Sequence, residues 1–169
     1  GVDYLIRALH RLKHDLGRTD FYTVIVGTGT DWDNLNALVK ELDMEDQIWM
    51  TGYISLSDML AYLSASHICV DPDPYNPFND KCTMIKMTEY MALGKPIVAF
   101  DLTEHRVTAG DSALYAKGND ELDFAHKIMQ LMDEPDERAR MGTLARERIE
   151  RELAWEFQVP SLLSAYEAV

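Results

Sequence analysis

One stretch constrains the fold more than any other: over residues 86–100, KMTEYMALGKPIVAF, a predicted amphipathic helix leads at once into a predicted buried strand. The helix is indicated by a stripe of apolar side chains at helical spacing, formed by Met84, Met87, Tyr90 and Met91. Lys86 and Glu89 fall outside that stripe, and Gly94 ends the helix. A proline then opens the apolar run 97–100, which is typical of a parallel strand that is buried on both faces.

Helical and strand patterns alternate along the whole chain. Between the helices we expect five strands, over residues 21–26, 48–50, 67–70, 97–100 and 113–115. The alternation predicts the α/β class, with a Rossmann-like three-layer α/β/α arrangement, a mainly parallel sheet of about five strands, and C-terminal helices. With 169 residues and a 47% hydrophobic composition, we expect residues 1–169 to form a single domain with one core.

The helices are marked by apolar faces and by start signals. Ser55 and Asp58 form a capping-box pattern, and Pro135 is placed to open a late helix. His10 and His14 have a spacing that could bind a metal, but no third ligand is evident, so a solvated helix face is favoured. Apolar residues mark four predicted helices, and those of the second are expected to face inward: Leu5, Ile6, Leu9 and Leu12; Leu35, Leu38, Val39 and Leu42; Met59, Leu60 and Leu63; Leu122, Ala125, Ile128, Met129 and Met132.

A Gly-x-Gly turn, formed by Gly27 and Gly29, follows the first predicted strand. It resembles a dinucleotide fingerprint, but Trp32 occupies the position where a third glycine would allow close packing of helix on strand. We therefore discount a nicotinamide site. Two interpretations stay open: the glycines only permit a tight turn, or they let a phosphate or sugar approach the backbone.

A rigid loop follows the third predicted strand, because three prolines between residues 71 and 77 exclude regular strand pairing. The loop leaves the carboxyl end of the strand, where open α/β sheets bind ligands, and leads into the helix that carries Glu89. Cys69 is interpreted as a small core residue, while Cys82 in the loop is either a packing residue or a ligand contact. Two cysteines without a CxxC spacing favour a reduced, cytoplasmic setting over a disulfide.

Charge and hydropathy exclude several classes of function. Twenty-nine acidic residues against sixteen Lys and Arg give a net charge of -13, which repels nucleic acid and anionic lipid. No apolar run reaches the roughly 18 residues that a membrane span needs, and the first residues lack a signal-peptide profile. An anionic ligand would therefore have to be held by local amides and a few bases.

Several segments together resemble a known family. Glu89 stands ahead of a Met-Ala-x-Gly-x-Pro sequence, and residues 76–79, Asn-Pro-Phe-Asn, are similar to a Glu-Pro-Phe-Gly loop. Four further segments match in family order: GVDYLIRAL, VIVGTGTDWDNL, IWMTGYIS and SLLSAYEAV. The chain thus resembles the C-terminal, donor-binding domain of the family 4 (group 1) glycosyltransferases, which have the GT-B fold. One departure is Lys81, which stands where the family usually has an earlier glutamate, eight positions before Glu89.

The resemblance implies a site for a UDP- or GDP-linked sugar, without a metal or a further cofactor. Glu89 would accept hydrogen bonds from both ribose hydroxyls. The helix start near Thr83 and Met84 would offer amides to phosphate, and Lys86 would supply a point charge. Without the resemblance, Lys86 and Glu89 would be interpreted as an exposed helical pair worth about 0.3 kcal/mol. The other donor-binding candidates are Asn79, Lys81, Cys82, Gly27, Gly29, Tyr53 and Ile54.

The roles of four residues stay open. Tyr53, with its neighbour Ile54, is either part of the nucleobase slot or an ordinary packing residue. Glu104 lies in a turn that resembles a second acidic loop of the family across the cleft, and is a weaker candidate. His105 beside it would usually be structural or simply exposed. No catalytic residue is assigned.

The resemblance covers one of two facing domains, since the family binds its acceptor in an N-terminal domain that is missing here. The usual first strand of the donor half, with its basic loop, would precede Gly1. We therefore expect the isolated chain to transfer nothing, and expect any membrane contact to lie in the absent domain. The leading hypothesis is half of a retaining glycosyltransferase. The alternatives are half of a nucleotide-sugar epimerase and a noncatalytic module that binds a nucleotide or a protein.

Overall fold

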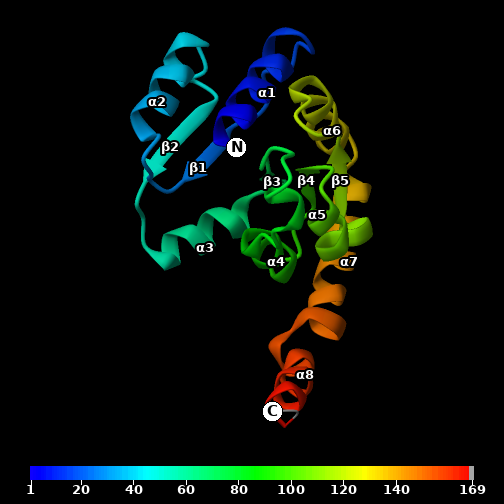
Figure 1. Ribbon diagram of the computed structural model, residues 1–169. Coiled ribbons are helices and arrows are strands. Elements are labelled where there is room, and N and C mark those ends of the chain that lie inside the picture. Colours follow the sequence, from blue (N-terminus) through cyan, green and yellow to red (C-terminus); the bar gives the residue numbers. More distant parts are fainter. Residues whose placement is uncertain (168–169) are drawn as a thin grey trace.

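The structure is a computed structural model, which describes residues 1–167. Strands and helices alternate as predicted (Figure 1). The strands are β1 (Thr23–Val26), β2 (Ile48–Gly52), β3 (Cys69–Asp71), β4 (Ile97–Phe100) and β5 (Ala113–Ala116). The helices are α1 (Val2–His14), α2 (Trp32–Glu41), α3 (Leu56–Ala65), α4 (Ile85–Ala92), α5 (Thr103–Ala109), α6 (Glu121–Asp133), α7 (Pro135–Arg148) and α8 (Trp155–Glu167).

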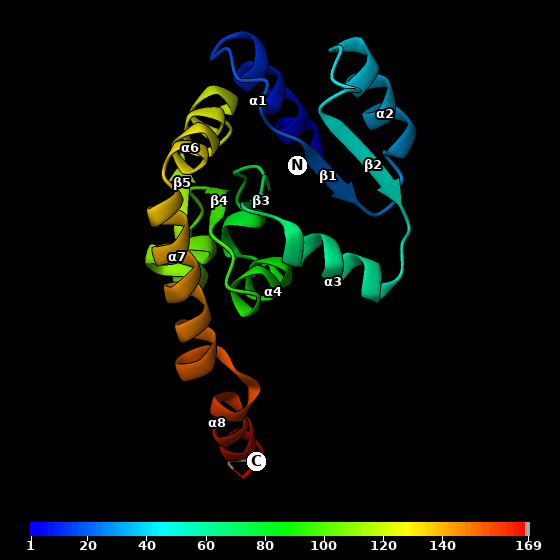
Figure 2. The ribbon, with the colours of Figure 1, turned by 180° about the vertical axis from the view of Figure 1, so that it is seen from behind.

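All strand pairing within the named strands is parallel, which confirms the α/β class. The strands do not form one continuous ladder, however: β1 pairs with β2, and β3, β4 and β5 pair in that order. A cavity of about 450 Å³ lies between β1 and β3 and is lined by residues of both strands, including Val24 and Val70. Figure 2 shows the two groups of strands on either side of this gap, joined by α3. The expected five strands are therefore present, but the cavity separates them into groups of two and three.

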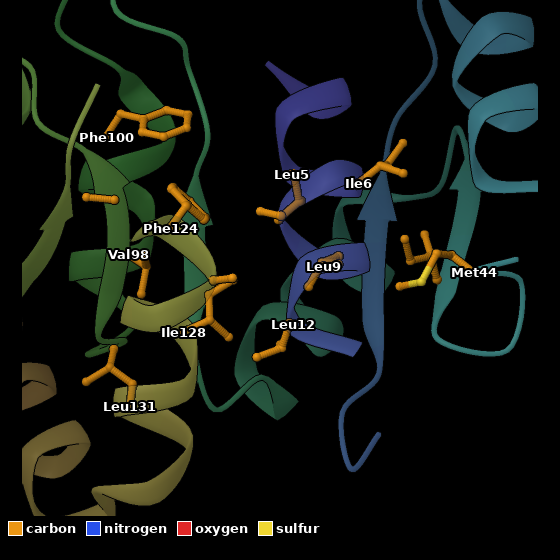
Figure 3. Close-up of a cluster of buried hydrophobic side chains, with 14 of the residues drawn as sticks. Leu5, Ile6, Leu9, Leu12, Met44, Val98, Phe100, Phe124, Ile128 and Leu131 are labelled. Carbon is orange, nitrogen blue, oxygen red and sulfur yellow. The ribbon is translucent and has the colours of Figure 1, made fainter. Parts of the chain in front are cut away.

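The strand β4 forms the centre of the larger group, and all four of its residues are buried. Alternate side chains point to opposite faces of a strand. Val98 and Phe100 pack with α1 and α6 in the larger apolar cluster (Figure 3). Ile97 and Ala99 pack with α4 and α7 in a second cluster. Helices therefore cover both faces of this sheet, as the three-layer prediction requires.

Most of the predicted helix faces are confirmed. The inward residues of α1 are buried, and so are Met87 and Met91 of α4, while Glu89 is exposed. Helix α3 forms where it was predicted but is not buried: none of its residues is buried, and Leu60 is 42% exposed. The helix spans the gap between the two groups of strands and borders the cavity through Leu63, so no packed sheet lies beneath its apolar side.

Two predicted helix starts, those of α3 and α7, are confirmed. The Ser55 hydroxyl accepts a hydrogen bond from the Asp58 amide at 3.1 Å, and Pro135 opens α7. The last helix, α8, projects away from the sheets (Figure 1). In the part of the chain that the structure describes, no helix combines the length and the apolar character that crossing a membrane requires.

Candidate functional site

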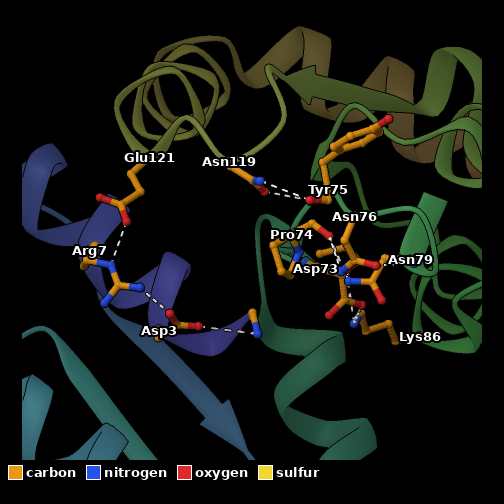
Figure 4. Close-up of polar contacts among 12 residues, drawn as sticks. Asp3, Arg7, Asp73, Pro74, Tyr75, Asn76, Asn79, Lys86, Asn119 and Glu121 are labelled. Atoms are coloured by element: carbon orange, nitrogen blue, oxygen red, sulfur yellow. Dashed lines mark hydrogen bonds and ion pairs between the residues drawn. The ribbon is translucent and has the colours of Figure 1, made fainter.

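A buried acid marks the carboxyl end of β3. Asp71, the last residue of that strand, is fully buried, and the ammonium Nζ of Lys86 lies 3.1 Å from its Oδ1. The same ammonium donates a hydrogen bond to the carboxylate of Asp73 (Figure 4). Lys86 is thus held between two carboxylates, and the first turn of α4 is fixed to the end of the sheet. Asp71, Asp73 and Lys86 are called the Lys86 cluster.

The members of this cluster shift one another's pKa values. Burial raises the pKa of Asp71, although the nearby charges of Lys86 and His105 act against the shift. Burial also opposes the ionisation of Asp73, but the hydrogen bond and charge of Lys86 outweigh it, so the pKa of Asp73 is lowered. Burial works against the charge of Lys86, yet the two acids raise its pKa, and the ammonium stays charged.

The loop between β3 and α4 is braced by its own polar groups, many of which Figure 4 draws. The Asn79 side chain donates to the Pro74 carbonyl at 2.8 Å, and the Asn79 amide donates to the Asn76 side chain at 2.8 Å. Across the loop, Asn119 accepts from the Tyr75 amide at 2.7 Å and donates to the Tyr75 carbonyl at 3.1 Å. In this structure Asn79 therefore stabilises the conformation of the loop.

Two contacts tie the end of this loop to α5. The Asp80 carboxylate accepts hydrogen bonds from the Thr103 amide at 2.8 Å and from the Thr103 hydroxyl at 3.1 Å. The Thr83 hydroxyl donates to the Glu104 carboxylate at 2.9 Å. Glu104, whose turn resembles a family loop across the cleft, is therefore a direct neighbour of Thr83.

The start of α4 is open to an anion. Met84 is the residue before the first helical turn, and no side chain caps the helix there. Within residues 1–167, the amides of Ile85 and Lys86 have no hydrogen-bond acceptor. The Ile85 side chain is 73% exposed, so solvent reaches this turn. Free amides at a helix start, with a lysine in the same turn, form a site that suits phosphate.

Glu89 lies one turn further along α4 and is exposed. No hydrogen bond or ion pair engages its carboxylate anywhere in the described chain. The alternative interpretation, an exposed Lys86–Glu89 pair, is wrong, because Lys86 binds Asp71 and Asp73 instead. Lys81 is exposed in a short 3-10 turn (Asn79–Lys81), and Cys82 is a partly buried free thiol.

The remaining candidates lie at the ends of β1 and β2. Gly27 has a φ of +124°, which favours glycine, and its amide donates to the Gly52 carbonyl at 3.1 Å. Gly29 follows two residues later, and Tyr53, just after β2, is 89% exposed. Ile54 beside it is partly buried. In residues 1–167 no polar contact joins this group to the Lys86 cluster, so the structure places the predicted site residues in two groups.

A metal is not indicated by the side-chain arrangement. In the described part of the chain, no three His, Cys, Asp or Glu residues gather closely enough to hold a metal ion. The rings of His10 and His14 stack with centroids 4.4 Å apart on the surface of α1, where we expected a solvated face.

Sequence reasoning missed three acids of the site, namely Asp71, Asp73 and Asp80. A signal existed for Asp71, because an acid directly after a buried apolar strand is unusual. His105 was predicted to be structural or exposed, and it is fully buried with Nε2 3.6 Å from Oδ2 of Asp71. Nothing in the sequence indicated that contact, which joins residues 34 positions apart.

Comparison with known proteins gives a consistent family. The family described as "Glycosyl transferases group 1" matches residues 1–134. A GDP-mannose-dependent monoacylated alpha-(1-6)-phosphatidylinositol monomannoside mannosyltransferase of Corynebacterium glutamicum is 28% identical over 160 residues, which cover 92% of this chain and 41% of that protein. Alpha-D-kanosaminyltransferase of Streptomyces kanamyceticus is 27% identical over 144 residues, covering 84% of this chain and 36% of that protein.

Solved structures share the fold. Sucrose-phosphate synthase from Thermosynechococcus elongatus superimposes with a TM-score of 0.84 at 22% identity, covering 99% of this chain and 42% of that one. TarM of S. aureus, solved with UDP, superimposes with a TM-score of 0.82 at 21% identity, covering 96% and 32%. The chain spans about two fifths of the length of the curated relatives that it matches.

Proposed function

Because the chain belongs to the group 1 glycosyltransferases, we propose that it is the donor-binding half of an enzyme that moves a sugar from a nucleotide diphosphate-sugar to a hydroxyl acceptor. We place the acceptor site in another part of the whole protein and the reaction in the cytoplasm. Retention of the anomeric configuration is part of the proposal, and it rests on the family alone. No metal is part of the proposed site.

One observation carries the proposal: in the described part of the chain, the first turn of α4 has free amides and no side-chain cap, and it carries Lys86, whose ammonium binds Asp71 and Asp73. A diphosphate needs hydrogen-bond donors and positive charge. The amides of Ile85 and Lys86 supply the donors, and the positive end of the helix dipole adds to their effect. The ammonium of Lys86 is already shared by two acids, so in this proposal the amides contribute most and the lysine mainly offsets the acids.

Glu89 completes the donor site in this proposal. A nucleotide whose phosphates lie at the start of α4 leaves its ribose near the next turn of the helix, where the exposed carboxylate of Glu89 has no competing partner among residues 1–167. A carboxylate accepts two hydroxyl protons in one bidentate contact, and charge-assisted hydrogen bonds are the stronger kind. The exposed ring of Tyr53 is then available to stack on the nucleobase, with Gly27 and Gly29 as an open backbone surface nearby.

The base of the donor is left as two candidates. The Corynebacterium relative is named as dependent on GDP-mannose, while the TarM structure holds UDP. We propose that this chain takes a donor of one of these two classes. Its net charge of -13 repels either anion at long range, so binding must come from the local donors.

Calorimetric titration of the protein with UDP-sugars and GDP-sugars tests the proposal. We expect one nucleotide class to bind and Glu89→Gln to weaken it about tenfold or more, since a lost hydrogen bond to a charged group costs about 1.5–3 kcal/mol. Glu45→Gln is the matched control, because Glu45 is another exposed acid, outside the site. Equal affinities for the Glu89 and Glu45 variants would contradict the assignment.

A second candidate is a noncatalytic nucleotide-binding module. The observation that favours it is Lys81, an exposed base where the family usually has an acid. Donor hydrolysis by the whole protein separates the two: an enzyme releases free sugar from its donor, whereas a module binds the nucleotide and leaves the donor intact.

We also propose that the cavity between β1 and β3 receives one more parallel strand, from a segment that precedes Gly1 in the whole protein. The amides of Thr23 and Cys69 point toward β2 and β4, so those of Val24 and Val70 point the other way, toward the cavity. Gly1 lies against Pro72, at the carboxyl end of β3, so a preceding segment would enter the cavity there.

Apolar side chains from helices line the cavity on both faces, including Leu9 of α1 and Tyr62 of α3. An added strand would therefore be buried on both faces, and its sequence should be a short apolar run. The resulting order, β2, β1, the added strand, β3, β4 and β5, is the doubly wound order of a dinucleotide-binding sheet.

A further inference from the structure

Two fully buried polar atoms face one another beneath the donor site: Oδ2 of Asp71 and Nε2 of His105, 3.6 Å apart. Neither atom has a hydrogen-bond partner within residues 1–167. The separation is an ion-pair distance and is too long for a formed hydrogen bond. Buried polar atoms without partners are rare and destabilising, so this pair calls for a physical account.

The other ring nitrogen of His105 fixes one proton. Nδ1 lies 2.9 Å from the carbonyl oxygen of Phe100, which can only accept, so Nδ1 carries a hydrogen. In a neutral imidazole Nε2 is then bare. A bare Nε2 would then face an ionised oxygen of Asp71, so that two lone pairs would point at one another. Water does not reach this place.

The charges of the cluster also indicate that one proton is missing. Lys86 supplies one positive charge to two acids, Asp71 and Asp73. Without another proton the cluster carries a net negative charge around a fully buried carboxylate, which is unfavourable. One proton on Nε2 or on Oδ2 makes the cluster neutral and gives both facing atoms a partner. Burial raises the pKa of Asp71, which agrees with this requirement.

The surrounding groups do not supply that charge. The Tyr90 phenol, on α4, has a raised pKa because it is buried, so it stays neutral. The Gly1 amine acts on Asp73, and on the His105 side the carboxylate of Asp101 is already paired with the guanidinium of Arg106, so neither group neutralises the pair. Lys86, Asp73 and Tyr90 act electrostatically on or with Asp71, and Asp101 does so with His105, while Cys69 acts on Tyr90 and the Gly1 amine on Asp73.

We propose that Asp71 and His105 share one proton at neutral pH and act together as a positioning element for Lys86. The proton sits between Oδ2 and Nε2, and it leaves Oδ1 of Asp71 aimed at the ammonium. His105 touches no donor atom in this scheme and acts only through Asp71. The role for Lys86 rests on the proposed function, whereas the shared proton does not.

The variant Asp71→Asn reproduces the protonated acid without a titratable group. Its amide nitrogen donates to Nε2, and its oxygen still accepts from Lys86. The unfolded chain holds little proton at pH 7 and almost none at pH 9 on these two side chains, because ordinary aspartate and histidine titrate near about 3.9 and about 6.5. The folded wild type holds one, so each pH unit lowers its folding constant by up to about tenfold.

We therefore expect the folding constant of the wild type to fall more steeply from pH 7 to 9 than that of Asp71→Asn, in denaturant titrations. Asp71→Ala, which restores neither contact, should be less stable than Asp71→Asn at every pH. Equal pH slopes for the wild type and Asp71→Asn would overturn the proposal.

Nitrogen NMR of the histidine rings decides the point without any variant, should Asp71→Asn fail to fold. Because the shared proton stays between the two side chains, we expect the ring nitrogen signals of His105 to keep the same positions from pH 6 to 8. A change of the His105 ring nitrogen signals over that pH range would overturn the shared proton. If the His105 ring stays constant and neither UDP nor GDP binds, the proposed function fails and the proton assignment is supported.

Discussion

The ammonium of Lys86 lies 3.1 Å from Oδ1 of Asp71, a carboxylate that is fully buried at the end of β3. This contact joins a helix to the carboxyl end of a strand, at the edge where parallel sheets bind ligands. Since Asp73 holds the same ammonium, the start of α4 is placed by two acids, one at the end of β3 and one in the loop that follows it. The donor site that we propose is built on that fixed helix start.

Removing the ammonium should destabilise the protein strongly. Lys86→Met leaves Asp71 buried without its cation, and breaking a buried pair costs about 3–5 kcal/mol. We expect about 2–3 kcal/mol, because the Lys86 side chain is itself 35% exposed and some solvent would replace it. Denaturant unfolding measures the loss. Lys117→Met is the control, since that side chain is 79% exposed, and a similar loss in both variants would contradict the account.

The fall in unfolding free energy at acid pH should depend on Asp73. Its pKa is lowered in the folded protein, so its ionised form adds stability above the ordinary value near 3.8, and this contribution disappears as the pH falls through the lower folded value. Asp73→Asn should therefore flatten the fall in unfolding free energy between pH 4 and pH 2. An unchanged profile in that range would show that Lys86 does not stabilise the Asp73 anion.

The contact between the loop and α5 is open to a direct test. Asp80→Ala removes the acceptor for the Thr103 amide at the start of α5, and loss of such a cap costs about 1 kcal/mol. Asp46→Ala, at an exposed acid outside the site, should cost much less. If the two variants unfold at the same denaturant concentration, the Asp80 contact does not stabilise the loop.

Hydrogen exchange of the backbone amides beside the cavity tests for the added strand. In this chain the amides of Val24 and Val70 point away from their paired strands, so their hydrogens should exchange with solvent quickly. In the whole protein we expect both to be protected, because the added strand pairs with β1 and β3. Fast exchange at both positions in the whole protein would contradict the proposed strand.

The fold followed from local pattern to a large extent. The apolar run of β4 and the stripe of Met84, Met87 and Met91 set their own positions, because each buries a face whose period is visible in the sequence. The separation of β1 from β3 could not be predicted, since it depends on which strands are neighbours in space and on what fills the space between them.

The site was predictable only in part. Glu89 and the start of α4 were placed within about two residues by motif and helix signals. The partners of Lys86 were not, because Asp71 and Asp73 meet it through the path of a proline-rich loop that no periodicity describes. The burial of His105 against Asp71 is a tertiary contact of the same kind, and only the structure shows it.

The most direct test of the donor site is an amide NMR titration of the protein with UDP and with GDP. We predict that one nucleotide shifts the amide signals of Ile85 and Lys86 most strongly, with smaller shifts around Glu89, and that Glu89→Gln weakens the response. Shifts confined to other parts of the chain, with the first turn of α4 unaffected by a nucleotide that binds, would contradict the account.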